Sequence, residues 1–194
     1  MKRRDFVKTA GIGSASLVTL STLANTFANP ALAGASLEGR PAAKFTVLLA
    51  GLYKPVMKCP NLGLTTVNVC DGTYRTIRIY PVSGLPLDDD DHEGSGPSDP
   101  HHRSPIGKFY LGSKYCAYDL PGGTIAMQFT SNTLVPVPDG QGGAFGVGTI
   151  ECNIVEATGV YQSFVGGHNT MVDIGHTLAD GSLIDDCFCN ISRP

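Results

Sequence analysis

The chain has 194 residues, of which 42% are hydrophobic, and its formal net charge is −3 at pH 7. This length is enough to bury a substantial core, and it predicts a single domain. An acidic chain without a basic patch is poorly suited to nucleic acids and to anionic membrane surfaces, so we expect no nucleic acid binding. We also expect no stable membrane insertion, because no stretch after the N-terminal run could span a membrane.

The N-terminal residues have the three parts of a secretory signal. A basic stretch is followed by a mildly apolar run over residues 10–27 and then by the small residues Ala31-Leu32-Ala33. This order predicts a signal peptide over residues 1–33 and one domain over residues 34–194. The alternative is an N-terminal membrane anchor. An anchor needs about 20 predominantly apolar residues, whereas this run is diluted by Gly, Ser and Thr.

The basic stretch resembles the bacterial twin-arginine (Tat) signal, which reads S/T-R-R-x-F-L-K. Arg3-Arg4, Phe6 and Lys8 match that pattern, whereas Lys2 and Val7 depart from it. The resemblance implies that the Tat machinery exports the folded protein to the periplasm or out of the cell. Removal of the signal takes away four basic residues and one acidic residue. The remaining 10 basic and 16 acidic residues give a formal charge of −6.

All six cysteines follow the predicted signal. They are Cys59, Cys70, Cys116, Cys152, Cys187 and Cys189. An even number in an exported chain favours disulfides, and six cysteines allow 15 complete pairings. Cys59 and Cys70 flank a turn and are the first pair we predict. Cys187 and Cys189 should point to one face of a strand, so we expect each to reach a different partner. The spacings lack a C-x2-C pair, and we predict no metal site.

The rest of the sequence predicts strands separated by Gly, Pro, Asn and Asp clusters, without a long helical period. The predicted strands are Lys44–Tyr53, Thr73–Tyr80, Ile106–Tyr118, Gly123–Thr130, Phe145–Val155, Gly166–Leu178 and Ile184–Ile191. About seven or eight short strands predict an all-β barrel or sandwich. The acidic segment Leu87–Pro105 predicts a long loop that is either the rim of a site or a solvated surface segment. Its aspartates could hold calcium, and His92, His101 and His102 could hold zinc, but we favour a solvated charge run.

A distinctive pattern lies in the C-terminal part of the chain. It runs from Gly148-Thr149-Ile150 through Ile154-Val155-Glu156 into Ala157-Thr158-Gly159-Val160-Tyr161, followed by Phe164 and Gly166-Gly167. This pattern resembles the late hairpin of the allene oxide cyclase and dirigent barrels, in which a strand ends in a short G-T/S-G-x-F/Y turn. Ala157 stands where those families have a glycine. The resemblance extends over Lys108–Ile191.

The resemblance implies a single closed barrel of eight antiparallel strands with an apolar pocket for a small hydrophobic or aromatic molecule. It further implies a cyclase, isomerase or lyase that needs no cofactor. The alternative is a non-catalytic periplasmic protein that binds such a molecule or directs its stereochemistry, as dirigent proteins do. A barrel with a filled interior is a third interpretation, and a homo-oligomer is left open. The families' catalytic residues cannot be placed one by one on this chain, so none is carried over.

The segment HNTMVDIGH supplies the predicted catalytic residues, His168, His176 and Asp173. A period of two puts both histidines on one face of a strand and Asp173 on the other. Along a straight strand the histidines would lie about 26 Å apart, too far to bind one metal. We predict that one of the histidines, or Asp173, enters the barrel as a general acid or base. The alternative is a surface position for both histidines.

Five further residues are predicted to bind the ligand. Tyr74, Tyr110 and Tyr115 could line a pocket and present a polar tip to it. Arg75 and Arg78 lie in a predicted strand, where one of them could face inward and orient an oxygen-bearing ligand. The alternatives are core packing for the tyrosines and surface charge for the arginines. The sequence has no G-x-S-x-G, P-loop or H-E-x-x-H motif.

Overall fold

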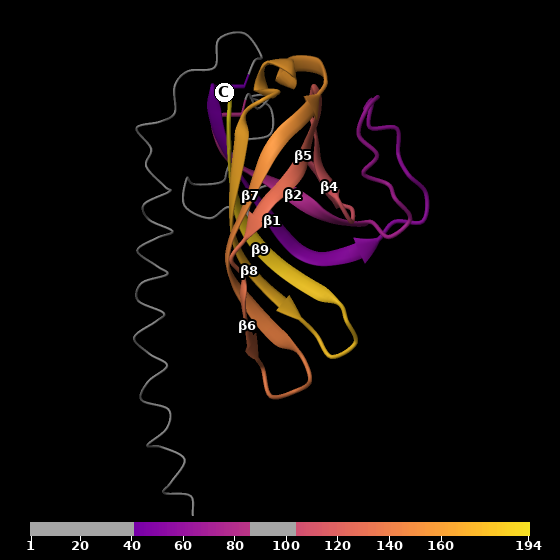
Figure 1. Ribbon diagram of the computed structural model, residues 1–194, viewed down its shortest axis with the longest axis vertical. Helices are drawn as coiled ribbons and strands as arrows, with labels where there is room; N and C mark the ends of the chain where they lie inside the picture. The colour runs from indigo at the N-terminus through magenta and orange to yellow at the C-terminus, as the bar shows by residue number, and fades with distance from the viewer. Residues whose placement is uncertain (1–40, 86–103) are drawn as a thin grey trace, which may run out of the picture. The chain divides into compact units, whose positions relative to one another are not determined.

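The computed structural model describes residues 41–85 and 104–194 (Figure 1). The chain divides into two units, Met1–Gly34 and Ala35–Pro194, and the described residues belong to the second. The predicted signal peptide and residues 87–103 of the predicted polar loop therefore lie outside the described residues. Within the described ranges, no helix is long and apolar enough to cross a membrane.

The described residues form nine strands and one 3₁₀ helix. The strands are β1 (Lys44–Pro55), β2 (Arg75–Ser83), β3 (Gly107–Leu111), β4 (Tyr115–Leu120), β5 (Gly123–Asn132), β6 (Val135–Pro138), β7 (Ala144–Ala157), β8 (His168–Thr177) and β9 (Leu183–Ser192), and the helix is η4 (Gly159–Phe164). The predicted segment Ile106–Tyr118 thus contains two strands joined by a tight turn. Strand β6 was not predicted.

The strands follow one another as an antiparallel meander that closes on itself. The hydrogen-bonded order is β5-β4-β3-β2-β1-β9-β8-β7-β6, and β5 also pairs with β7. β5 pairs with the second half of β7, and β6 pairs with its first half. Together β5 and β6 act as one interrupted strand, so the sheet closes into an eight-stranded antiparallel barrel. This confirms the predicted fold class.

Alternation along each strand fills the barrel interior with apolar side chains. On β9 the buried positions are Asp185, Cys187, Cys189 and Ile191, each separated by a more exposed residue. Phe45, Val47 and Leu49 of β1 belong to the same core. Because the side chains of a strand point alternately to its two faces, one face of every strand can face the interior.

The turn that follows β7 seals one end of the barrel. It forms η4, seen as the short coil at the top of Figure 1. Tyr161 and Phe164 of this helix are buried against Phe45, and the rings of Phe45 and Phe164 lie 5.4 Å apart. The Tyr161 hydroxyl donates to the Pro121 carbonyl oxygen at 3.0 Å. Gly159 has a φ of +58° here, a conformation that glycine adopts without strain.

Residues 56–74, between β1 and β2, cover part of the outer face of the barrel. Leu62 and Val69 from this connection pack against the outward side chains of β3, β4 and β5. The carboxylate of Glu156 on β7 holds the connection in place, because it accepts hydrogen bonds from the backbone and hydroxyls of Thr65 and Thr66. Burial raises the pKa of Glu156, but the hydrogen bonds from Thr66 and Thr65 outweigh it and lower the pKa to about 2.

The predicted disulfide between Cys59 and Cys70 is confirmed, and it lies within this outer connection. The expectation that Cys187 and Cys189 reach different partners is wrong. Both thiols point into the barrel interior, 3.7 Å apart, and neither forms a disulfide with a described residue. Cys116 and Cys152 are likewise free and buried.

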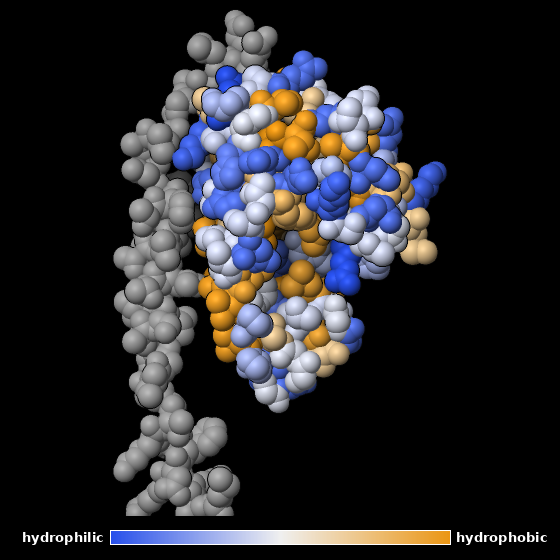
Figure 2. Space-filling view, in the orientation of Figure 1, coloured by the Kyte–Doolittle hydropathy of each residue, from blue (hydrophilic) through white to orange (hydrophobic). Residues whose placement is uncertain are grey.

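Exposed apolar side chains gather over β6 and its neighbours, on the lower left of the face seen in Figure 2. By strand register, Val137, Phe145 and Ile184 lie in one row across β6 to β9, in which His176 of β8 lies between Phe145 and Ile184. The side chains of Val137, Phe145 and Ile184 are each exposed.

Candidate functional site

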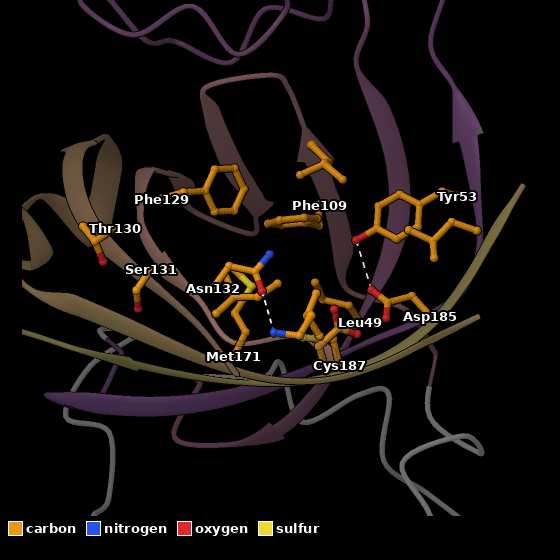
Figure 3. Close-up of a pocket in the computed structure, with 15 residues that line it drawn as sticks. Leu49, Tyr53, Phe109, Phe129, Thr130, Ser131, Asn132, Met171, Asp185 and Cys187 are labelled. Atoms are coloured by element: carbon orange, nitrogen blue, oxygen red, sulfur yellow. Dashed lines mark hydrogen bonds between the residues drawn. The ribbon is translucent and has the colours of Figure 1, made fainter. Parts of the chain in front are cut away.

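A cavity of about 470 Å³ opens at the end of the barrel away from η4 (Figure 3). Its position follows from β1, where Phe45 contacts η4 but Leu49 and Tyr53, farther along the strand, line the cavity. Most of its wall is apolar, with Phe109, Phe129 and Met171 among the lining residues. The barrel therefore holds a pocket large enough for a small molecule, and a completely filled interior is ruled out.

Polar side chains interrupt this apolar wall, and besides Thr130, Ser131 and Asn132 they include two carboxyl groups and a phenol. Asp173 comes from β8, Asp185 from β9 and Tyr53 from β1. Asp173 is 8% exposed and Asp185 is 4% exposed. The Tyr53 hydroxyl donates a hydrogen bond to Asp185 Oδ2 at 3.1 Å, drawn as a dashed line in Figure 3. Apart from the two carboxyl groups themselves, no described group donates to Oδ1 of either aspartate.

The strand register explains how the two carboxyl groups meet. Asp185 lies opposite Gly175 on β8, and Asp173 lies opposite Cys187 on β9. A Cβ atom at Gly175 would lie 3.6 Å from Oδ1 of both aspartates and 3.3 Å from Leu183 Cδ1. The missing side chain of Gly175 therefore leaves the space that both carboxyl groups border.

Burial keeps a proton on this pair. Burial raises the pKa of Asp185, and the hydrogen bond and charge of neighbouring Asp173 raise it further, to about 9. Burial, followed by the charge of Asp185, also raises the pKa of the Tyr53 phenol well above its usual value. At neutral pH Asp185 is therefore protonated and Tyr53 is a hydrogen-bond donor. The Asp185 proton also supplies a donor between two groups that otherwise only accept.

The pair can take part in acid–base chemistry. Two adjacent carboxyl groups that hold one proton offer one acid and one base, because like charges at close range cannot both ionise. The apolar wall around them strengthens every electrostatic interaction in the pocket. This arrangement can donate a proton to one atom of a bound molecule and accept a proton from another.

The same region could also hold a metal ion. Among the described residues, Asp173, Asp185 and Cys187 form the one group whose ligand atoms lie within 4.8 Å of one another. Carboxylate and thiolate ligands suit zinc. However, the hydrogen bond between Cys187 and Cys189, together with burial, raises the pKa of the Cys187 thiol well above its usual value. Metal binding here would have to displace both the thiol proton and the carboxyl proton.

Of the three predicted catalytic residues, Asp173 lies in the pocket and the two histidines do not. His168 contacts Glu151 on the outside of the barrel. His176 Nε2 lies 2.9 Å from Asp139 Oδ2, and its ring stacks on Phe145 with centroids 4.0 Å apart. The surface position that we considered as the alternative therefore describes both histidines.

None of the five predicted ligand-binding side chains lines the described pocket. Tyr110 is buried on the outer face, beneath residues 56–74, and Tyr115 packs against the same outer cluster. Tyr74 is buried at the end of that connection, and Arg75 and Arg78 are exposed. Core packing and surface charge, the alternative interpretations, therefore describe these residues. On β2 the interior positions belong to isoleucines.

Sequence reasoning missed Asp185 and Tyr53, although a signal for Asp185 was present. Cys187 and Cys189 were expected to share a face of their strand. The same period of two places Asp185 on that face, and the structure shows all three buried. Tyr53 was the last residue of a predicted strand, and nothing in the sequence near it indicates its hydrogen bond to Asp185.

The chain matches no protein family, no curated protein and no solved structure. Its functional interpretation therefore depends on the pocket and on the residues within it.

Proposed function

We propose that the protein is an exported, cofactor-independent enzyme that moves a proton within a small hydrophobic or aromatic metabolite held in the barrel. Cyclisation, isomerisation and elimination by a lyase all include such a step. The observation that carries this proposal is the pair of buried carboxyl groups, Asp173 and Asp185, in the wall of a predominantly apolar pocket.

In the proposed reaction the carboxylate of the pair removes a proton from the bound molecule, and the carboxylic acid returns one to a second atom. The total number of protons on the pair is unchanged after each cycle. Tyr53 holds Asp185 in place through its hydrogen bond. The apolar wall excludes water and fixes the conformation of the substrate, which reduces the entropy cost of the reaction.

The resemblance to allene oxide cyclases and dirigent proteins supports the same proposal. Those families use a closed eight-stranded barrel with an apolar pocket to hold a reactive molecule in one conformation. Fold alone does not fix function, so the carboxyl pair carries more weight than the resemblance. We further propose that the Tat machinery exports the chain and that it works in the periplasm or outside the cell.

The second candidate is a non-catalytic protein that binds or stereochemically directs an apolar molecule. The apolar wall formed by Phe109, Phe129 and Met171 favours it. A carrier of a neutral molecule has no need for buried carboxyl groups, whose burial is costly. The two candidates therefore differ in what Asp173 and Asp185 do.

A neutral proton-transfer probe separates the two candidates. Removal of the ring C–H proton of 5-nitrobenzisoxazole breaks its N–O bond and releases a coloured cyanophenolate, so a buried carboxylate should accelerate its ring opening. We expect the unaltered protein to exceed the double variant D173N/D185N by at least about 100-fold in rate. The control is E151Q, which removes a carboxylate on the outside of the barrel. Equal rates with equal binding of N-phenyl-1-naphthylamine would instead establish the carrier.

A further inference from the structure

We propose that the natural ligand of the pocket is an apolar amine, bound as its ammonium ion by Asp173 and Asp185. This inference names the class of substrate that the proposed acid–base site takes. Turnover of the amine rests on the proposed function, whereas binding of the amine does not.

The first argument is the sign of charge in the pocket. Its described lining contains two aspartates and no lysine, arginine or histidine. Any charge that the two carboxyl groups carry is therefore negative, and no described cation in the wall offsets it. A ligand carboxylate or phosphate would meet repulsion there without a compensating cation. The pocket therefore suits a neutral or, better, a singly positive molecule.

The second argument is the set of unused acceptors. Oδ1 of Asp173 and Oδ1 of Asp185 are buried, and apart from the carboxyl proton that the pair shares, no described group donates a hydrogen bond to either. Both border the space beside Gly175. An ammonium group carries several N–H donors in a small volume, so it can reach acceptors on both aspartates. A neutral alcohol supplies one donor and leaves the negative charge uncompensated.

The third argument is the aromatic part of the pocket wall. The rings of Phe109, Phe129 and Tyr53 border the pocket in Figure 3. Aromatic rings bury the apolar body of a ligand and also stabilise a cation near their faces. A small cation without an apolar body would leave this wall unfilled. The pair of acids and the aromatic wall therefore together favour an amine that carries a ring or an aliphatic body.

Three probes of nearly equal shape test this inference: 1-naphthylmethylamine, 1-naphthylmethanol and 1-naphthoic acid. Their affinities for the exported, processed protein would be measured by calorimetry at pH 7. We expect the amine to bind at least about tenfold tighter than the alcohol, and the acid to bind most weakly. In D173N/D185N the preference for the amine should disappear, whereas E151Q should retain it.

Failure to bind the amine, affinity for the acid equal to that for the amine, or a preference that survives in D173N/D185N would each overturn the inference. The comparison of the three probes on the unaltered protein does not depend on the folding of any variant. Ring opening of 5-nitrobenzisoxazole reports proton transfer on a neutral molecule. If that activity persists while the amine fails to bind, the substrate class is wrong and the acid–base function stands.

Discussion

Tyr53 and Asp185, 132 positions apart in the sequence, are joined by a hydrogen bond of 3.1 Å inside the barrel. The bond exists because β1 pairs with β9, which brings the end of the first strand beside the start of the last. It fixes one oxygen of Asp185 and leaves the other facing Asp173 and Gly175. The meander thus assembles a three-residue polar group from three separate strands.

Y53F tests whether this hydrogen bond positions the acid pair. The ring is kept and only the donor is lost, so the fold should survive. We expect the ring-opening rate of 5-nitrobenzisoxazole to fall about tenfold, since a hydrogen bond to a carboxyl group contributes about 1–2 kcal/mol. The matched control is Y161F, which removes a buried hydroxyl at the sealed end of the barrel. A rate unchanged by Y53F would contradict a positioning role.

The raised pKa of Asp185 predicts how stability depends on pH. The ordinary pKa of this carboxyl is 3.8 and its pKa in the folded protein is about 9, so between these values the folded state holds the extra proton. The free energy of unfolding should therefore fall as pH rises from 4 towards 9, by at most about 1.4 kcal/mol per pH unit for one proton. Urea unfolding of the protein and of D185N at several pH values would measure this slope. Parallel curves for the two proteins would disprove it.

G175A tests the space between the two carboxyl groups. The added methyl would lie close to Leu183 and would border both Oδ1 atoms. Because the close contact is with the end of a flexible side chain, we expect a small change in melting temperature but at least a tenfold loss of amine affinity. G146A, on the neighbouring strand, places its methyl in an ordinary contact and should leave amine binding unaltered.

Substitution of Cys187 distinguishes proton transfer by the carboxyl pair from catalysis by a metal ion bound at the same residues. If the carboxyl pair acts without a metal, C187S and dialysis against a chelator should each leave the ring-opening rate within about twofold, a difference below 0.5 kcal/mol. C189S is the matched control, since Cys189 is buried on the same strand outside the ligand group. Loss of activity on chelation, restored by zinc in the unaltered protein but not in C187S, would identify a metal centre instead.

Export through the Tat machinery is tested by changing Arg3 and Arg4 together to lysine. The charge of the signal is kept and only the arginine pair is lost, so export of processed protein should fall sharply. Fractionation of cells followed by immunoblotting measures the exported share. K8R serves as the control, since it keeps both arginines. Undiminished export of the double variant would rule out the twin-arginine route.

The fold could be predicted from the sequence because alternation and turn residues are local signals. The strand over Ile184–Ile191 was predicted within a residue of its observed ends. Strand β6 was not predicted, because two of its four residues are prolines, which lack a donor N–H. Only its position along β7, where it continues the path of β5, makes it a strand.

The site was less predictable, since it depends on which strands become neighbours. Alternation placed Asp173 and the two histidines on opposite faces, but it could not say which face would be the interior. In the structure the face that carries Asn169, Met171 and Asp173 is buried, so the two histidines lie on the outer face. Likewise, residues 56–74 fold over the outer face of the barrel and bury Tyr110, and no local sequence pattern predicts this.

The pairing of β1 with β9 also sets the order of events during biosynthesis. The ribosome completes β9 after every other described strand, so the barrel cannot close until translation of β9 is finished. If the chain is exported folded, closure takes place in the reducing cytosol, where disulfides do not persist. The Cys59–Cys70 bond would then be added outside the cytosol, to a barrel that is already closed. Its place on the outer connection, with Cys59 exposed, leaves it open to a periplasmic oxidant.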